Sequence, residues 1–222
     1  MKIGFIGAGK MATAIAGGLI RKGVCGVDGI LAADIAADAR DRFQQETGAR
    51  VLTDNAALVQ QVDTVVLAVK PQQAQQVLAP LRDGLRDRLV ISIAAGLRLA
   101  RLQEWGTPAR TIRVMPNTPA LVGEGAAVFA CAAGVTAADR ALCRRVLEAV
   151  GMVHELPEDQ LDAVTALSGS GPAFVFAWVE AMRDGACRLG LDAGIAEELA
   201  VQTAAGAAAM LKQGCGTPAD LR

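Results

Sequence analysis

The sequence predicts an α/β protein in which a doubly wound sheet is followed by an all-helical region. Apolar runs typical of strands alternate with helical patterns from residue 3 to residue 156, and no such run follows Pro157. Alternation of this kind is typical of a mostly parallel sheet with helices on both faces. Ligands of such sheets bind at the carboxyl ends of the strands. The residues directly after each strand are therefore the first candidates for a functional site.

The first strand, over residues 3–6, leads into the turn Gly7-Ala8-Gly9 and then into a helix that contains Ala12. In a dinucleotide-binding fingerprint the first glycine allows a tight turn and the second lets the backbone approach a pyrophosphate. The third small residue lets the helix pack on the strand. The helix N-terminus adds free N–H groups and a partial positive charge. The segment predicts a Rossmann-type dinucleotide site, and a tight turn that binds nothing is the alternative.

A second strand is expected over residues 29–34, and it ends in Asp34. An acidic residue about 20 positions after the glycine motif binds the adenosine ribose in dinucleotide-binding folds. A carboxylate there accepts hydrogen bonds from the ribose hydroxyls and repels a 2′-phosphate, which favours NADH. Arg40 and Arg42 follow on the next helix and could still reach a phosphate. The alternative is that Asp34 caps the helix that begins near Ala36.

The remaining elements of the sheet follow in alternation. Asp54-Asn55 resembles a helix cap, and the buried run 63–69 is typical of a strand covered on both faces. Residues after the strands include Lys70-Pro71, Ala94-Ala95-Gly96 and the segment 116–119. The further strands are expected at 51–52, 63–69, 89–93, 111–115, 128–130 and 152–156, and the helices at 72–82, 97–105 and 137–149.

After Pro157 the pattern becomes helical. Helices are expected over 159–167, 173–189 and 193–212, with a break at the segment 168–172. A helical region of this size is marginal alone, and its small-residue stretch 203–209 needs covering, so we infer packing on a second subunit. We predict a dinucleotide-binding domain of residues 1–156 and a helical domain of residues 157–222.

Composition excludes several classes of partner. The 222 residues carry a net charge of −1 and aromatic residues make up 3%, which argues against nucleic acid and anionic membranes. No apolar run reaches the roughly 18 residues of a membrane span. With His154 as the one histidine, no metal site is expected. The five cysteines lack CxxC spacing and predict reduced thiols in the cytoplasm.

Two further motifs are more specific than the glycine turn. They are Met-Pro-Asn-Thr-Pro at 115–119 and Leu-Ser-Gly-Ser-Gly-Pro-Ala at 167–173. With the segments 7–12, 68–72 and 92–96, they make the whole chain resemble pyrroline-5-carboxylate reductases, the enzymes of the last step of proline biosynthesis. The resemblance implies NADPH or NADH as cofactor and a C-terminal helical domain that dimerises, with an active site shared between the two domains. A homodimer or larger homo-oligomer is therefore expected.

The resemblance also implies roles for individual residues. Asn55 approaches the adenosine side, Lys70 and Pro71 border the nicotinamide ribose, and the substrate region contains Asn117, Ser168 and Ser170. Lys70 could instead be a solvated charge at a helix start, and the two serines could be helix caps before Pro172. The residues expected to bind the cofactor are Gly7, Ala8, Gly9, Lys10, Met11, Asp34, Asn55, Ala68, Val69, Lys70, Pro71, Ala94, Ala95 and Gly96.

The implied reaction is hydride transfer from the nicotinamide to the carbon of a cyclic imine that carries a carboxylate. A protonated imine is already electrophilic, so neither a metal nor a nucleophile is required. The protein's task is to position the two reactants and exclude water. The sequence names no proton donor.

Family members continue beyond the position of Arg222 into a Ser-Pro-Gly-Gly-Thr-Thr loop that is implied to hold the substrate carboxylate. We therefore expect a C-terminally truncated member with an incomplete substrate site. Two other hypotheses stay open. One is an inactive or nucleotide-binding remnant. The other is an oxidoreductase like the β-hydroxyacid dehydrogenases, although residues 168–188 lack the lysine that those enzymes need.

Overall fold

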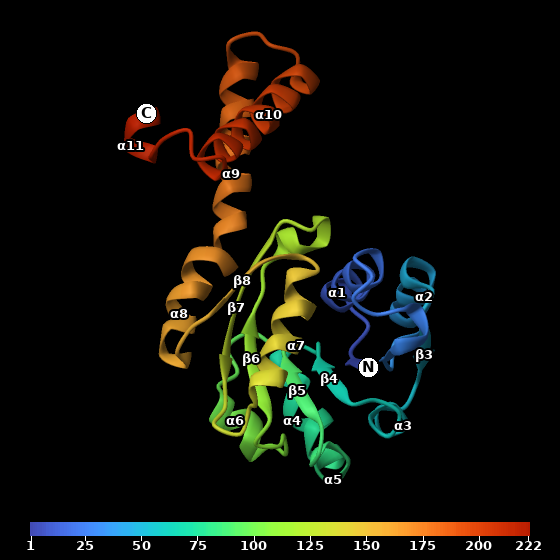
Figure 1. Cartoon of the computed structure of the whole chain (residues 1–222). Coiled ribbons are helices and arrows are strands. Elements are labelled where there is room, and N and C mark those ends of the chain that lie inside the picture. Colours follow the sequence, from blue (N-terminus) through green and yellow to red (C-terminus); the bar gives the residue numbers. More distant parts are fainter. The chain divides into compact units, whose positions relative to one another are not determined.

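The computed structural model describes residues 1–222, which form two compact units, residues 1–169 and residues 170–222. The first unit contains an eight-stranded sheet with helices on both faces, and the second is helical (Figure 1). The predicted doubly wound sheet followed by a helical region is therefore confirmed. No helix combines the length and the apolar composition that crossing a membrane requires.

The strand order is β3-β2-β1-β4-β5-β6-β7-β8. The first six strands in this order are parallel and follow the arrangement of dinucleotide-binding sheets, in which the order reverses between β1 and β4. The carboxyl ends of these two strands therefore flank the crevice in which a ligand is expected. The strands are β1 Ile3–Ile6, β2 Ile30–Ala33, β3 Arg50–Leu52, β4 Thr64–Leu67, β5 Leu89–Ser92, β6 Thr111–Met115, β7 Gly125–Cys131 and β8 Gly151–Glu155.

The helices of the first unit lie where the sequence predicts them, with small shifts at their ends. The helix expected over 72–82 is split in the structure into α4, a 3-10 turn and α5. The helix expected over 159–167 consists of a 3-10 turn, α8 and a π-helical turn over Thr165–Gly169. The helices are α1 Lys10–Arg21, α2 Ala37–Thr47, α3 Asn55–Val59, α4 Pro71–Leu78, α5 Arg82–Leu85, α6 Leu99–Glu104, α7 Ala137–Glu148 and α8 Leu161–Val164.

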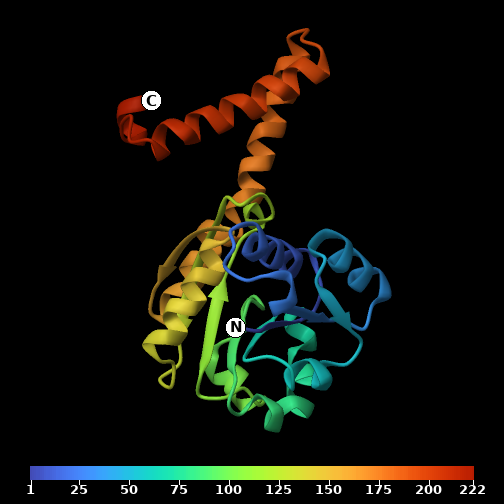
Figure 2. The ribbon, with the colours of Figure 1, turned by 45° about the vertical axis from the view of Figure 1, so that its right-hand side comes forward.

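Two hydrophobic cores cover the two faces of the sheet. Helices α1, α2 and α7 lie on one face of the sheet and α3, α4 and α5 on the other (Figures 1 and 2). Side chains of β1 alternate between the two cores, because Phe5 belongs to the first and Ile6 to the second. The ring of Phe5 lies 5.9 Å from that of Phe43 on α2, centroid to centroid. Burial on both faces explains why β4 and β5 read as continuous apolar runs.

The last two strands depart from a purely parallel sheet. β7 pairs with β6 in the antiparallel sense, and β8 is parallel to β7. The segment 116–124 between β6 and β7 contains only a 3-10 turn, Thr118–Val122. Parallel strands need a longer crossover connection, which α7 supplies between β7 and β8. The sequence predicts that both strands extend the sheet, but not that their direction reverses.

The second unit contains α9 Gly171–Arg188, α10 Ala193–Lys212 and the short α11 Pro218–Leu221. Helices α9 and α10 contact each other, and Asp192 caps α10 by accepting the N–H groups of Gly194 and Ile195. The expected break at 168–172 is narrower than predicted, since the π-helical turn runs to Gly169 and α9 begins at Gly171. The domain boundary at residue 157 stays a prediction.

Candidate cofactor and substrate site

A cavity of about 620 Å³ lies at the carboxyl ends of β1, β2 and β4. This is the edge at which the strand order reverses, where doubly wound sheets bind ligands. Its walls contain half of the residues that the sequence predicts for cofactor binding. These are Gly7, Gly9, Asp34, Asn55, Ala68, Val69 and Lys70.

The two glycines of the first turn differ in why a side chain is absent there. Gly7 has φ +96°, and a Cβ there would lie 2.7 Å from the carbonyl oxygen of Ala68, so this position requires glycine. Gly9 has φ −75° and ψ 176°, which any residue adopts, and no heavy atom lies within 4 Å of a Cβ built on it. Gly9 therefore leaves open space over the start of α1.

The N-terminus of α1 faces this space without a side-chain cap, because Gly9 is its N-cap residue. The first N–H groups of a helix have no partner within the helix and carry a partial positive charge. Lys10 is the first helical residue and adds a full positive charge. The uncapped helix end and the open side of Gly9 fit the pyrophosphate of a dinucleotide.

Asp34 holds the glycine turn in place. Its Oδ2 accepts a hydrogen bond of 2.8 Å from the N–H of Ala8, and its Oδ1 accepts one of 2.9 Å from the N–H of Ala36. The N-cap residue of α2 is Ala36, so the alternative that Asp34 caps this helix is wrong. Each carboxylate oxygen keeps a free lone pair with which it could accept a ribose hydroxyl.

A cation lies close to the same turn. Nη1 of Arg40 donates hydrogen bonds to the carbonyl oxygens of Asp34 at 2.8 Å and of Ile35 at 3.0 Å. The guanidinium therefore binds the backbone that carries Asp34, and not its carboxylate. A 2′-phosphate at this position would meet the charge of Asp34 and that of Arg40 together.

The far wall of the cavity is apolar and was missed by the sequence analysis. Ile35 leaves β2 with 84% of its surface exposed, and Val77, Pro80 and Leu81 come from α4 and the turn behind it. The exposure of Ile35 is visible only in the structure, so the sequence holds no local signal for this wall. Its apolar composition suits an apolar ring of a ligand.

Lys70 and Asn55 lie at the starts of two helices on the cavity wall. Lys70 is exposed and directly precedes Pro71, the first residue of α4. Asp54 caps α3 by accepting the N–H of Ala56 at 2.8 Å, as the sequence predicts, and Asn55 begins that helix. Lys70 forms no ion pair in the structure. It could therefore border the nicotinamide ribose or be a solvated charge at the start of a helix, and both interpretations stay open.

The loop after β5 lies along the same edge of the sheet but outside the 620 Å³ cavity. Ala94 is buried, whereas Ala95 and Gly96 are exposed, and Gly96 has φ +76°. Their backbone is thus accessible at the carboxyl end of a strand next to β4. The structure also places Ala8, Lys10, Met11 and Pro71 outside the cavity lining, although all of these except Met11 directly adjoin a lining residue in the sequence.

The substrate-region residues divide between the two units. Asn117 uses both polar atoms within the first unit, because Oδ1 accepts the N–H of Ala126 at 2.8 Å and Nδ2 donates to the carbonyl oxygen of Ser168 at 3.1 Å. Oγ of Ser168 donates to the carbonyl oxygen of Val164. Ser170 precedes α9 without a capping hydrogen bond, so neither serine caps that helix.

Comparison with known proteins shows to which family the chain belongs. A family model described as pyrroline-5-carboxylate reductase dimerisation matches residues 158–222, and one described as NADP oxidoreductase, coenzyme F420-dependent, matches residues 2–96. Pyrroline-5-carboxylate reductase of Methanosarcina acetivorans is 43% identical over 225 residues, which cover 100% of this chain and 83% of the relative. This chain belongs to the pyrroline-5-carboxylate reductase family.

Other members of the pyrroline-5-carboxylate reductase family agree in sequence and structure. The Pseudomonas aeruginosa reductase is 43% identical over 224 residues, covering 100% of this chain and 82% of the relative. The Coxiella burnetii structure has a TM-score of 0.88 at 37% identity, with 98% of this chain and 86% of that chain covered. The Plasmodium falciparum structure with NADP bound has a TM-score of 0.89 at 30% identity, covering 100% and 82%.

Membership of the pyrroline-5-carboxylate reductase family confirms the resemblance that the motifs at 115–119 and 167–173 indicated. Enzymes outside it, such as the Aquifex aeolicus prephenate dehydrogenase at 20% identity and a TM-score of 0.64, share the fold alone. The family assignment decides against the alternative of a β-hydroxyacid dehydrogenase-like enzyme.

Proposed function

We propose that this chain reduces 1-pyrroline-5-carboxylate to L-proline with NADPH or NADH, the last step of proline biosynthesis. One observation carries the proposal. This chain is 43% identical over its full length to two pyrroline-5-carboxylate reductases, and it has a cavity lined by the residues of the nucleotide turn at the reversal point of its sheet.

Different residues around the cavity would bind different parts of the cofactor. The uncapped start of α1 and the open side of Gly9 would receive the pyrophosphate, and Asp34 would receive the adenosine ribose. Asn55 and Ile35 would border the adenosine end, and Lys70 would lie beside the nicotinamide half. When bound, NAD(P)H supplies the hydride.

The protein's contribution to the chemistry is orientation. The loop 94–96 presents accessible backbone at the carboxyl end of β5, where it would border the nicotinamide. Asn117 and Ser168 hold the adjoining end of β6 to the π-helical turn. Two reactants held in the right geometry react much faster than free ones, and a rigid edge of the sheet favours this.

Asp34 favours NADH, since its charge would face the 2′-phosphate of NADPH. Arg40 works in the opposite direction because its guanidinium lies against the same loop. The proposed enzyme therefore accepts both cofactors, with a preference for NADH that is set by the balance of these two side chains.

The second unit is proposed to form a homodimer. Its two long helices expose large apolar side chains that water does not favour, and this region matches the dimerisation family model. The five cysteines form no disulfide, which suits a reducing compartment such as the cytoplasm. The exposed apolar residues of α9 and α10 are Phe174, Val175, Phe176, Trp178, Ile195, Leu199, Val201, Met210 and Leu211.

The test is a turnover measurement with the purified chain. Loss of nicotinamide absorbance should depend on added 1-pyrroline-5-carboxylate, and L-proline should accumulate in the same molar amount. Omission of the imine serves as the control. Cofactor binding without proline formation would contradict the proposed reaction and favour the alternative named above, a nucleotide-binding remnant whose substrate site is incomplete.

A further inference from the structure

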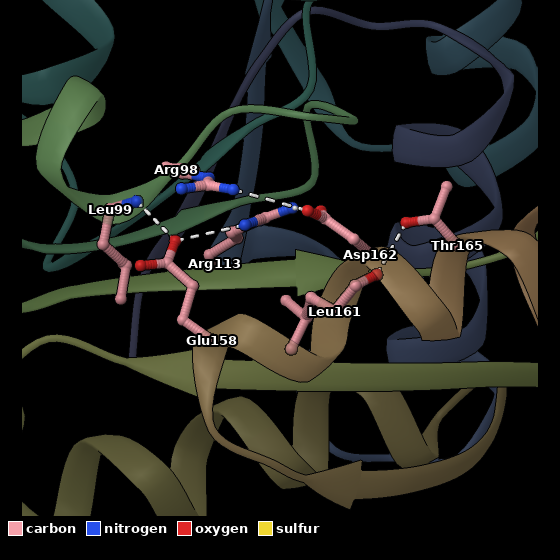
Figure 3. Close-up of polar contacts among 7 residues, drawn as sticks. All are labelled: Arg98, Leu99, Arg113, Glu158, Leu161, Asp162 and Thr165. Atoms are coloured by element: carbon pink, nitrogen blue, oxygen red, sulfur yellow. Dashed lines mark hydrogen bonds and ion pairs between the residues drawn. The ribbon is translucent and has the colours of Figure 1, made fainter.

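A group of four charged side chains lies beside β6, outside the cofactor cavity. Arg113 projects from β6, Arg98 directly precedes α6, and Glu158 and Asp162 come from the segment before the π-helical turn (Figure 3). We call this group the charge cluster. It joins three segments that are distant in the sequence.

Glu158 is the centre of the charge cluster. Its Oε1 accepts a hydrogen bond of 2.7 Å from the backbone N–H of Leu99 and one of 3.2 Å from Nη1 of Arg113 (Figure 3). Nη2 of Arg113 reaches Oδ1 of Asp162 at 3.4 Å, and Arg98 lies 3.5 Å from Oδ2 of the same residue. One carboxylate oxygen therefore links α6 to β6.

The burial of these groups shows which contacts matter. Arg113 is 3% exposed and Glu158 is 28% exposed, whereas Arg98 and Asp162 are 71% and 65% exposed. Ion pairs between exposed side chains contribute little, because water screens them. A buried guanidinium needs a partner, so the pair of Arg113 and Glu158 is the strong contact of the cluster.

The hydrogen bond to Leu99 replaces a local helix cap. Leu99 is the first residue of α6, and its N-cap residue is Arg98, whose side chain cannot accept a hydrogen bond. Glu158, far away in the sequence, satisfies the first N–H of this helix instead and adds a negative charge at its N-terminus.

The capped helix end is also one end of the loop after β5. At the other end, the N–H of Ile93 donates to the carbonyl oxygen of Leu67, which continues the sheet. Between these two anchors lie Ala95 and Gly96, which are exposed. Glu158 therefore fixes the far end of the loop that we place beside the nicotinamide.

The segment that carries Glu158 is fixed at its other end as well. It runs through the π-helical turn to Ser168, whose carbonyl oxygen accepts a hydrogen bond from Asn117 at the end of β6. A Cβ on Gly169 would lie 2.4 Å from Cε of Met115, so the turn lies directly against that strand. π-Helical turns are frequent at functional sites.

We propose that Glu158 is a positioning residue for hydride transfer. Through Leu99 it fixes the loop 94–98 at the end of β5, and through Arg113 it fixes that loop relative to β6 and the π-helical turn. The inference rests on the proposed function, since it assigns the loop to the nicotinamide side. Glu158 does not line the cofactor cavity, so its proposed role is exerted through Leu99 and Arg113.

Three variants of the full chain test the proposal. Glu158→Ala removes the acceptor of both hydrogen bonds. Glu158→Gln keeps a carbonyl oxygen that can accept the N–H of Leu99 but loses the charge that Arg113 needs, and it serves if the alanine variant fails to fold. Glu155→Gln is the matched control, because it breaks the ion pair with Arg140 at the end of β8 without contacting the loop.

The first readout is hydrogen exchange of the amides at 94–99, which does not depend on activity. We expect exchange at Leu99 to accelerate at least tenfold in Glu158→Ala, less in Glu158→Gln and not at all in Glu155→Gln. Unchanged exchange in both Glu158 variants would overturn the proposal, even if the wild-type chain has no reductase activity.

The second readout separates positioning from folding. We expect kcat to fall by about 10- to 100-fold in Glu158→Ala, because a misplacement of the reactants by about 1 Å can cost roughly 100-fold. The dissociation constant of NADPH should stay within twofold, and the isotope effect with 4-deuterated NADPH should rise. Glu158→Gln should recover part of kcat. An equal loss of kcat in Glu155→Gln, or unchanged kcat in Glu158→Ala, would refute a positioning role.

A wild-type chain that produces no proline would refute the proposed function instead. In that case accelerated exchange at Leu99 would still support the anchoring of the loop by Glu158. The two failures are therefore distinguishable.

Discussion

Replacement of Gly9 by valine separates cofactor binding from folding. The backbone at Gly9 is extended, and no heavy atom lies within 4 Å of a Cβ there. Valine is compatible with this conformation, and it reduces the freedom of the unfolded chain. We expect the free energy of unfolding to change by no more than about 1 kcal/mol.

Cofactor affinity should respond very differently. The branched side chain of valine would fill the space over the uncapped start of α1, where the pyrophosphate is proposed to lie. A hydrogen bond to a charged group contributes about 1.5–3 kcal/mol. If valine prevents two hydrogen bonds between the start of α1 and the pyrophosphate, about 3–6 kcal/mol of binding free energy is lost. The dissociation constant then rises roughly 10²- to 10⁴-fold.

Fluorescence titration with NADH and NADPH measures the affinity, and denaturant unfolding measures the stability. Gly7→Ala is the contrasting variant, because φ is +96° and its Cβ would lie 2.7 Å from the carbonyl oxygen of Ala68. It should lose at least about 2 kcal/mol of unfolding free energy. Unchanged cofactor affinity in Gly9→Val would show that the nucleotide does not bind at this turn.

Three further predictions concern polar side chains of the first unit. Asp34→Ser should weaken NADH binding and shift the preference toward NADPH by about tenfold, since it removes a charge that faces a 2′-phosphate; dissociation constants for both cofactors test this, and an unchanged ratio contradicts it. Asn117→Ala should lower the free energy of unfolding by about 2–4 kcal/mol, because the N–H of Ala126 and the carbonyl oxygen of Ser168 lose their partner; denaturant unfolding measures it. The carboxylate of Asp139 accepts hydrogen bonds from the guanidinium of Arg110 and from the backbone N–H of Thr136, which lower the pKa of its carboxyl from 3.8 to about 2. Because the pKa is lower in the folded state, Asp139 contributes about 2 kcal/mol above pH 4, and this is lost as the pH falls toward 2. The stability difference between wild type and Asp139→Asn should shrink over the same range, and a constant difference would contradict the linkage.

The sequence predicts the front half of the fold because the relevant signals are local. The strand, the glycine turn and the start of α1 lie within twelve consecutive residues, and Gly7 has a steric reason there because its φ is positive and a Cβ would collide with the backbone of Ala68. The same holds for the cap at Asp54 and for the bounds of α10, which match the predicted range 193–212.

Features that depend on distant contacts were not predicted. The reversed direction of β7 follows from how the short segment 116–124 returns along the sheet, which no periodicity reveals. The cap that Glu158 gives to Leu99 joins residues far apart in the chain, so neither residue shows it locally. The sequence does not predict the apolar wall at Ile35, because an isoleucine next to a strand is expected to be buried in the hydrophobic core.

The two hydrogen bonds of Asp34 have a consequence for anyone who wishes to exchange one cofactor for the other. Its carboxylate links the end of β2 to the glycine turn through the N–H of Ala8. A substitution of Asp34 that favours binding of a 2′-phosphate therefore also loosens the turn that is proposed to bind the pyrophosphate. Recognition of the ribose and the shape of the turn are thus linked in one side chain. A redesign that leaves Asp34 in place and alters Ile35 or Arg40 can change selectivity while the turn keeps its anchor.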